Sequence, residues 1–77
     1  MSVRVEEGVI HLTGRCLAED AEALLVALQE GPERIVNLAE AQRLHLAVVQ
    51  LLLATRPQIR GVAGNTFLPA HVVNLLQ

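Results

Sequence analysis

The chain has 77 residues, a net charge of −2, one cysteine and one phenylalanine, and 52% of its residues are apolar. This length predicts a single domain over residues 1–77. The six basic residues are all arginines and are scattered along the sequence. This argues against binding to nucleic acid or to anionic membranes, because both require clustered positive charge. Sites for single-stranded nucleic acid also use several aromatic rings, which this chain lacks.

The cysteine content and the hydropathy pattern indicate the cellular compartment. One cysteine cannot form a disulfide within the chain, so a reducing compartment is expected. The N-terminus lacks the basic-then-apolar pattern of a secretion signal. No apolar run approaches the roughly 20 residues that span a bilayer. We therefore expect a cytoplasmic protein that does not insert into membranes.

The first half of the chain predicts a hairpin followed by a helix. Residues 2–6 alternate apolar and charged side chains, which predicts a half-buried strand, and residues 9–13 form a second β-rich run. Residues 7–8 between them are typical of a tight turn. Residues 18–30 change to a helical period, and the Gly-Pro pair at residues 31–32 ends this helix.

The second half predicts alternating strands and helices. Residues 34–38 are apolar and rich in β-branched side chains, which predicts a central buried strand. Residues 42–56 contain no Gly or Pro and predict a long helix that ends before Pro57. A short strand over residues 59–63 and a last helix over residues 69–77 follow. The order β-β-α-β-α-β-α predicts an α/β fold with a four-stranded mixed sheet and three helices.

The helix predicted over residues 42–56 is apolar on two faces. At about 100° per residue, one face is an ordinary core stripe. This stripe consists of Leu44, Ala47, Val48, Leu51, Leu52 and Thr55. The opposite face is polar, yet Leu46, Val49 and Leu53 lie within it. An apolar strip with a polar margin is a candidate docking surface for another protein. The alternative is that a loop or helix of the same chain covers these three side chains.

The central part of the sequence carries a family pattern. Residues 35–38 read Ile-Val-Asn-Leu, a short polar stretch follows, and residues 44–54 are rich in Leu. This arrangement resembles the core of a STAS domain, the fold of bacterial anti-sigma factor antagonists. Residues 9–14 resemble the early strand of that family, which ends in Gly, and residues 56–64 resemble its next crossover. The resemblance spans nearly the whole chain and implies a STAS-like fold that is C-terminally shorter than in many members.

The chain departs from the family where the second helix begins. The family motif Asp-Ser-Ser-Gly corresponds here to His45, Leu46, Ala47 and Val48. In the phosphorylation-switched members, a partner kinase phosphorylates a serine of that motif. Neither central position has a hydroxyl in this chain, and Leu46 places an apolar group there. The resemblance therefore implies a STAS-like binding module without the usual Ser phospho-switch.

The three histidines and the single cysteine offer little catalytic or metal chemistry. A zinc site needs three or four converging ligands, but His11, His45 and His71 lack partners of that type at i+3 or i+4, and Cys16 lies alone. We expect no metal, no cofactor and no catalytic residue, and we expect Cys16 to fill a gap between helix and sheet. The alternative from the enzyme class is a phosphotransfer protein that uses His45 as the carrier.

These patterns predict a non-enzymatic protein–protein interaction module, a STAS-like regulator or adaptor. The family implies three kinds of partner: an anti-sigma factor, a sensor kinase, or an ATPase, the last because STAS-like subunits occur in phospholipid transporters. Self-association as a homodimer is a further alternative, because a short sheet leaves an edge strand to be covered. The predicted partner-binding residues are Arg43, His45, Leu46, Val49, Gln50, Leu53 and Arg56.

Overall fold

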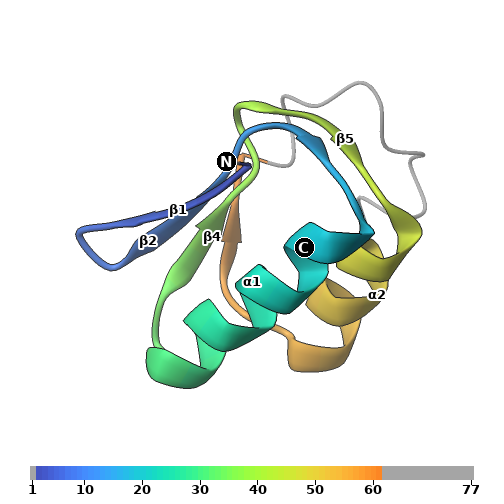
Figure 1. The fold of residues 1–77 in the computed structure, drawn as a ribbon. Coiled ribbons are helices and arrows are strands. Elements are labelled where there is room, and N and C mark those ends of the chain that lie inside the picture. The colour runs from blue at the N-terminus through green and yellow to red at the C-terminus, as the bar shows by residue number, and fades with distance from the viewer. Residues whose placement is uncertain (1, 62–77) are drawn as a thin grey trace.

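A computed structural model of the chain describes residues 2–61 and places two helices against one face of a β-sheet (Figure 1). The helices are α1 (Ala18–Glu30) and α2 (Leu46–Thr55). The strands are β1 (Val3–Glu6), β2 (Val9–Leu12), β3 (Gly14–Cys16), β4 (Ile35–Asn37), β5 (Ala41–Leu44) and β6 (Ile59–Arg60). The predicted α/β class is confirmed.

The main sheet has four strands in the order β1-β2-β4-β6. Strands β1 and β2 are antiparallel, whereas β2 with β4 and β4 with β6 are parallel. The β1–β2 turn has positive φ at both Glu7 (50°) and Gly8 (78°), which matches the twist of a tight hairpin. The mixed four-stranded sheet expected from the sequence is therefore confirmed.

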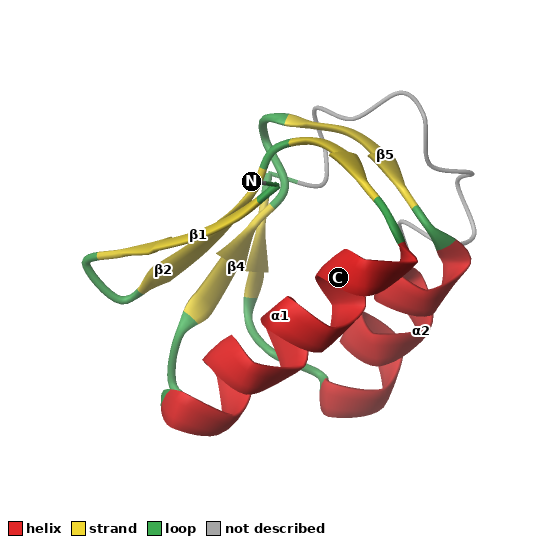
Figure 2. Cartoon of the chain, viewed as in Figure 1, coloured by secondary structure: helices red, strands yellow, loops and turns green. Residues whose placement is uncertain are grey.

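A second, two-stranded sheet was not expected from the sequence. It pairs β3 with β5 in parallel, and Figure 2 shows these two strands arching from the main sheet toward the starts of the helices. The chain leaves β2 at Gly14, whose φ of 62° favours glycine. The β3–β5 pair thus carries the chain to the point where each helix begins.

The prediction of one helix over residues 42–56 is wrong for its first four residues. Residues 42–44 belong to β5, and His45 is the extended cap before α2, with φ −61° and ψ 148°. The reason is a long-range pairing, because β5 finds its hydrogen-bonding partner in β3. The backbone N–H of His45 continues that pairing by donating to the Cys16 carbonyl oxygen at 2.8 Å.

The core lies between the helices and the main sheet. Ile10 of β2 and Val36 of β4 are fully buried on the helix-facing side of the sheet, opposite Leu24 of α1 and Leu52 of α2. Burying each such side chain contributes roughly 1.5–3 kcal/mol. The two helices also pack against each other, so the fold holds both helix N-termini near the β3–β5 pair.

The remaining element predictions have different outcomes. The helix over residues 18–30 is confirmed as α1, and it ends at Gly31. The strand over residues 59–63 is described as far as β6 (Ile59–Arg60). The third helix, over residues 69–77, lies outside the described residues. Within residues 2–61, neither helix is long and apolar enough to cross a membrane.

Candidate functional site

The predicted apolar strip on α2 is smaller in the structure than in the sequence. Leu46 is 65% exposed, while Val48 on the core face is fully buried, as expected. Val49 and Leu53 are only partly buried, as are the core-stripe residues Leu44 and Leu51. The predicted contrast between the two faces of the helix therefore holds for Leu46 and is wrong for Val49 and Leu53.

The other predicted contact residues are exposed but do not all lie together. Arg43 is on β5, and His45 caps α2 beside it. Gln50 lines a groove between α1 and α2. Arg56 follows the last residue of α2, and a helix of ten residues is about 15 Å long. The predicted surface therefore divides into one group at the start of α2 and one residue at its far end.

A hollow of about 490 Å³ lies where β3 and β5 lead into the two helices. We call it the β3–β5 hollow. It is lined by Arg15, Cys16, Leu17, Arg43, Leu44 and His45. Two of these residues, Arg43 and His45, were predicted as contact residues, while Arg15 and Leu17 were missed. No sequence signal identified β3, because three residues are too few for a periodic pattern.

Two helix caps form where the strands of the hollow lead into the helices. The carboxylate Oδ2 of Asp20 accepts a hydrogen bond from the Leu17 backbone N–H at 2.7 Å at the start of α1. At the start of α2, Nδ1 of His45 accepts one from the Ala47 backbone N–H at 3.0 Å. Each cap satisfies one of the backbone donors that a helix leaves free at its N-terminus. His45 thus acts as a cap, a function more often supplied by Ser, Thr, Asp or Asn.

Two arginines carry the charge of the hollow. Arg15 and Arg43 are directly opposite each other in the β3–β5 register, and both are exposed. Among residues 2–61, Arg4 and Glu6 form an ion pair at 3.9 Å, and both of their side chains are largely exposed. Neither Arg15 nor Arg43 has a carboxylate partner among residues 2–61. The hollow therefore presents two neighbouring positive charges that form no ion pair within residues 2–61.

Cys16 lies beneath this surface as a neutral side chain. It is buried, and burial of the thiol, reinforced by the nearby Asp20 carboxylate, raises the pKa of Cys16 from 9.0 to about 11. A thiol is a nucleophile only in its ionised form. Cys16 is therefore a packing residue at neutral pH, which agrees with the expected gap-filling role.

The geometry of His45 is unfavourable for phosphotransfer. Its Nδ1 accepts the Ala47 N–H, so Nδ1 holds no proton and its lone pair is engaged. In a neutral imidazole the proton then lies on Nε2. Neither ring nitrogen has a free lone pair to attack a phosphoryl group while this cap is formed.

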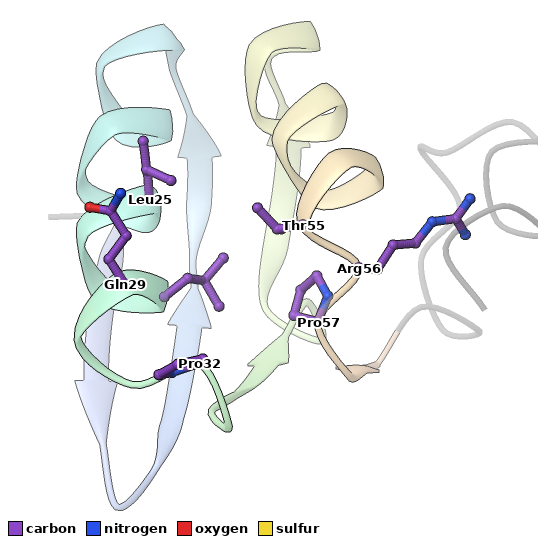
Figure 3. A pocket seen from close by; sticks show the side chains of 7 residues that line it. Leu25, Gln29, Pro32, Thr55, Arg56 and Pro57 are labelled. Atoms are coloured by element: carbon purple, nitrogen blue, oxygen red, sulfur yellow. The ribbon is translucent and has the colours of Figure 1, made fainter.

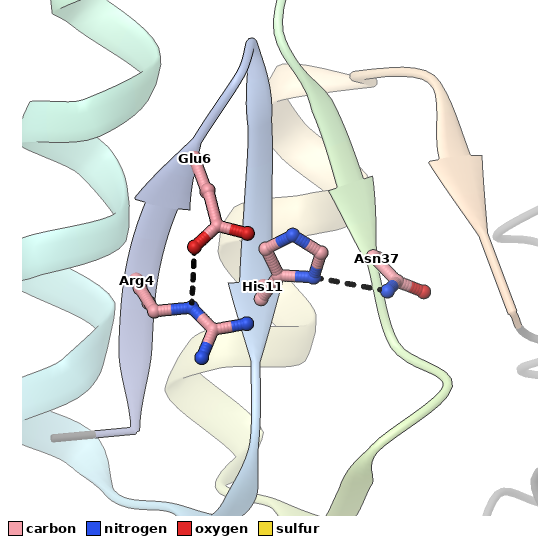
Figure 4. Close-up of polar contacts among 4 residues, drawn as sticks. All are labelled: Arg4, Glu6, His11 and Asn37. Carbon is pink, nitrogen blue, oxygen red and sulfur yellow. Dashed lines mark hydrogen bonds and ion pairs between the residues drawn. The ribbon is translucent and has the colours of Figure 1, made fainter.

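The face of the main sheet opposite α1 and α2 carries a row of polar side chains. Nδ2 of Asn37 lies 3.1 Å from Nδ1 of His11, next to the Arg4–Glu6 pair on β1 (Figure 4). The register places Arg4 beside His11, His11 beside Asn37, and Asn37 beside Arg60. Among the described residues, no group of three or more His, Cys, Asp or Glu side chains converges as a metal site would require. The third histidine, His71, lies outside the described residues.

A second hollow, of about 360 Å³, lies between the C-terminal ends of the two helices (Figure 3). It is lined by Leu25, Leu28, Gln29, Pro32, Thr55, Arg56 and Pro57. Among these residues, Arg56 alone is charged. The Thr55 hydroxyl donates to the Leu51 carbonyl oxygen at 2.7 Å within α2. This hollow therefore offers apolar surface with little polar chemistry.

No protein-family model, curated protein or solved structure matches the chain significantly.

Proposed function

We propose that the chain is a non-catalytic protein–protein interaction module of STAS-like type, and that the start of α2 is its contact surface. The exposure of Leu46 carries this proposal. A leucine that is 65% exposed at the first residue of a helix stabilises the free protein little. Covered by a partner, the same side chain would add a large part of the roughly 1.5–3 kcal/mol that a buried leucine contributes.

The surroundings of Leu46 have the composition of an interface. The polar side chains of Arg43, His45 and Gln50 border it and are all exposed. An apolar centre with a polar, solvated rim is the usual anatomy of a protein contact. The module would then bind through the end of the molecule at which β5 leads into α2.

The order of the elements supports the STAS-like part of the proposal. An N-terminal hairpin is followed by parallel strands, and a helix lies between each successive pair of parallel strands in the main sheet. His45 caps α2 at the position where the family has Asp, and β4 ends in Asn37 at the position of the family's Asp/Asn. The family then suggests an anti-sigma factor, a sensor kinase or a transporter ATPase as partner, in the bacterial cytoplasm.

The serine switch of the family has no equivalent in α2. Leu46 and Ala47 offer no hydroxyl, and Thr55, the hydroxyl residue of this helix, lies in its last turn with its hydroxyl bonded to Leu51. A Ser/Thr kinase directed at this helix would therefore not regulate binding of the partner. Phosphate mapped to Thr55 by mass spectrometry, together with loss of the partner, would contradict this.

A pull-down from host extract tests the proposal. Leu46→Asp should lose the captured protein, whereas the control Val26→Asp should keep it, because Val26 is a similarly exposed apolar residue on α1. Size-exclusion chromatography of each variant distinguishes a second copy of the chain from another protein. Retention of the partner by Leu46→Asp would place the contact surface elsewhere. An acid-labile phosphate on His45 would favour the phosphotransfer alternative.

A further inference from the structure

We infer that the β3–β5 hollow binds an acidic segment of a protein partner, with an apolar side chain of that segment packed against Leu17 and Leu46. This inference rests on the proposed function, since it specifies the chemistry of the partner at the same end of the molecule. It adds Arg15 and Leu17 to the contact residues suggested by the sequence.

The first observation is the arginine pair. Arg15 and Arg43 share one register position on adjacent parallel strands, and neighbouring strands are about 4.8 Å apart. Like charges directly opposite each other on neighbouring strands repel and destabilise the pairing. Because no carboxylate among residues 2–61 pairs with either arginine, a carboxylate from outside the chain would relieve that repulsion.

The second observation is independent of charge. Leu46 (65% exposed) and Leu17 (53% exposed) are the two most exposed large apolar side chains among the described residues. Leu17 directly precedes α1, and Leu46 is the first residue of α2. Leu17 therefore lines the hollow together with the arginine pair, and Leu46 directly follows the lining residue His45.

The positive end of the α2 helix dipole adds to the positive charge of Arg43. The first turn of α1 contains Glu19 and Asp20, whose carboxylates offset the positive end of that helix dipole. The first turn of α2 contains no acidic residue. The uncompensated helix end thus lies beside Arg43, on a chain whose net charge is −2.

An acidic protein segment fits both observations better than other anions. Inorganic phosphate would satisfy the arginines and leave both leucines exposed. Nucleic acid would require the aromatic platforms and clustered basic residues that the composition lacks. A segment with carboxylates beside an apolar side chain complements the charge and the leucines together.

Titration of the isotope-labelled full chain with synthetic peptides tests the chemistry. The probe is an end-blocked peptide of Glu and Leu, compared with a Glu and Ser peptide, a Lys and Leu peptide, and sodium phosphate at equal ionic strength. The Glu and Leu peptide should shift the amide signals of Leu17, His45, Leu46 and Ala47 and bind at least tenfold more tightly than the others. Equal binding of phosphate or of the Lys and Leu peptide would overturn the inference.

Charge reversal provides the matched control. Arg15→Glu and Arg43→Glu should each weaken binding of the Glu and Leu peptide at least tenfold. Arg60→Glu should not, because Arg60 is an exposed arginine on β6, away from the hollow. In the pull-down, a captured protein that is lost in Leu46→Asp but kept in both Arg15→Glu and Arg43→Glu would refute the acidic segment and leave the proposed function standing. A protein kept by all three variants would refute both.

Discussion

Replacing Leu46 by Asp should leave the fold nearly as stable as before. With 65% of Leu46 exposed, about a third of its surface is covered, so losing the leucine costs about 0.5–1 kcal/mol of transfer free energy. An aspartate at the first position of a helix returns roughly 0.3–1 kcal/mol through the helix dipole. The two effects nearly cancel, and the melting temperature should change by less than about 4 °C.

The matched core variant is Leu52→Asp. Leu52 is fully buried in the same helix, so its replacement loses the packing of a whole side chain and buries an unpaired carboxylate. Together these cost several kcal/mol, comparable to the total stability of so small a domain. Circular dichroism melts should show a cooperative transition for Leu46→Asp and none for Leu52→Asp. A drop of 10 °C or more for Leu46→Asp would show that Leu46 belongs to the core.

Three further predictions concern the His45 cap, the Cys16 thiol and two glycines. His45→Ala should lower the free energy of unfolding by about 1 kcal/mol in urea titrations, and His45→Asn should restore it; equal stability of all three proteins would exclude the cap. Between pH 9 and 11 the Cys16 thiol ionises in the unfolded chain but keeps its proton in the folded protein. The free energy of unfolding should therefore fall by on the order of 2 kcal/mol over this range. The same loss in a Cys16→Ala variant would contradict this. Gly61→Ala should destabilise the fold more than Gly8→Ala. Both glycines have positive φ, but a Cβ at Gly61 would lie 2.5 Å from the Ala39 backbone nitrogen, whereas Gly8 faces open space. Comparable urea midpoints for the two variants would refute the close contact.

The elements that the sequence predicted well are those with local signals. Helix α1 has a helical apolar period, acidic residues in its first turn and a Gly-Pro stop, and its bounds agree with the prediction. The β1–β2 hairpin has alternating residues around a glycine turn. Each of these patterns lies within one continuous stretch of the chain, so the element can be predicted without knowing which distant segment it packs against.

Strand β5 could not be predicted in the same way. Residues 41–44 read Ala-Gln-Arg-Leu and contain no helix breaker, so local propensity favours extending the following helix over them. Their extended conformation depends on pairing with β3, a three-residue strand far away in sequence. The boundary signal was His45, but histidine is not among the usual capping residues, and its role is visible only from the bond to Ala47.

The angular position around α2 explains the misplaced Val49 but not Leu53, which also packs against the core. Val48 and Leu52 set the direction of the core, and at about 100° per residue Val49 lies about 80° from it and Leu46 about 140°. Val49 is therefore at the margin of the core stripe, while Leu46 faces away from it. Arg15 was missed because its position opposite Arg43 depends on the unexpected β3–β5 pair.

Mapping the bound partner on the chain by amide chemical shifts tests the central claim most directly. When the captured protein is added to the isotope-labelled chain, the largest changes should occur at Leu17 and over residues 43–47, with little change at His11 or Gln29. Largest changes at Gln29 and Thr55, which line the hollow between the helix ends, or at His11 and Asn37 on the face of the sheet opposite α1 and α2, would contradict a contact surface at the start of α2.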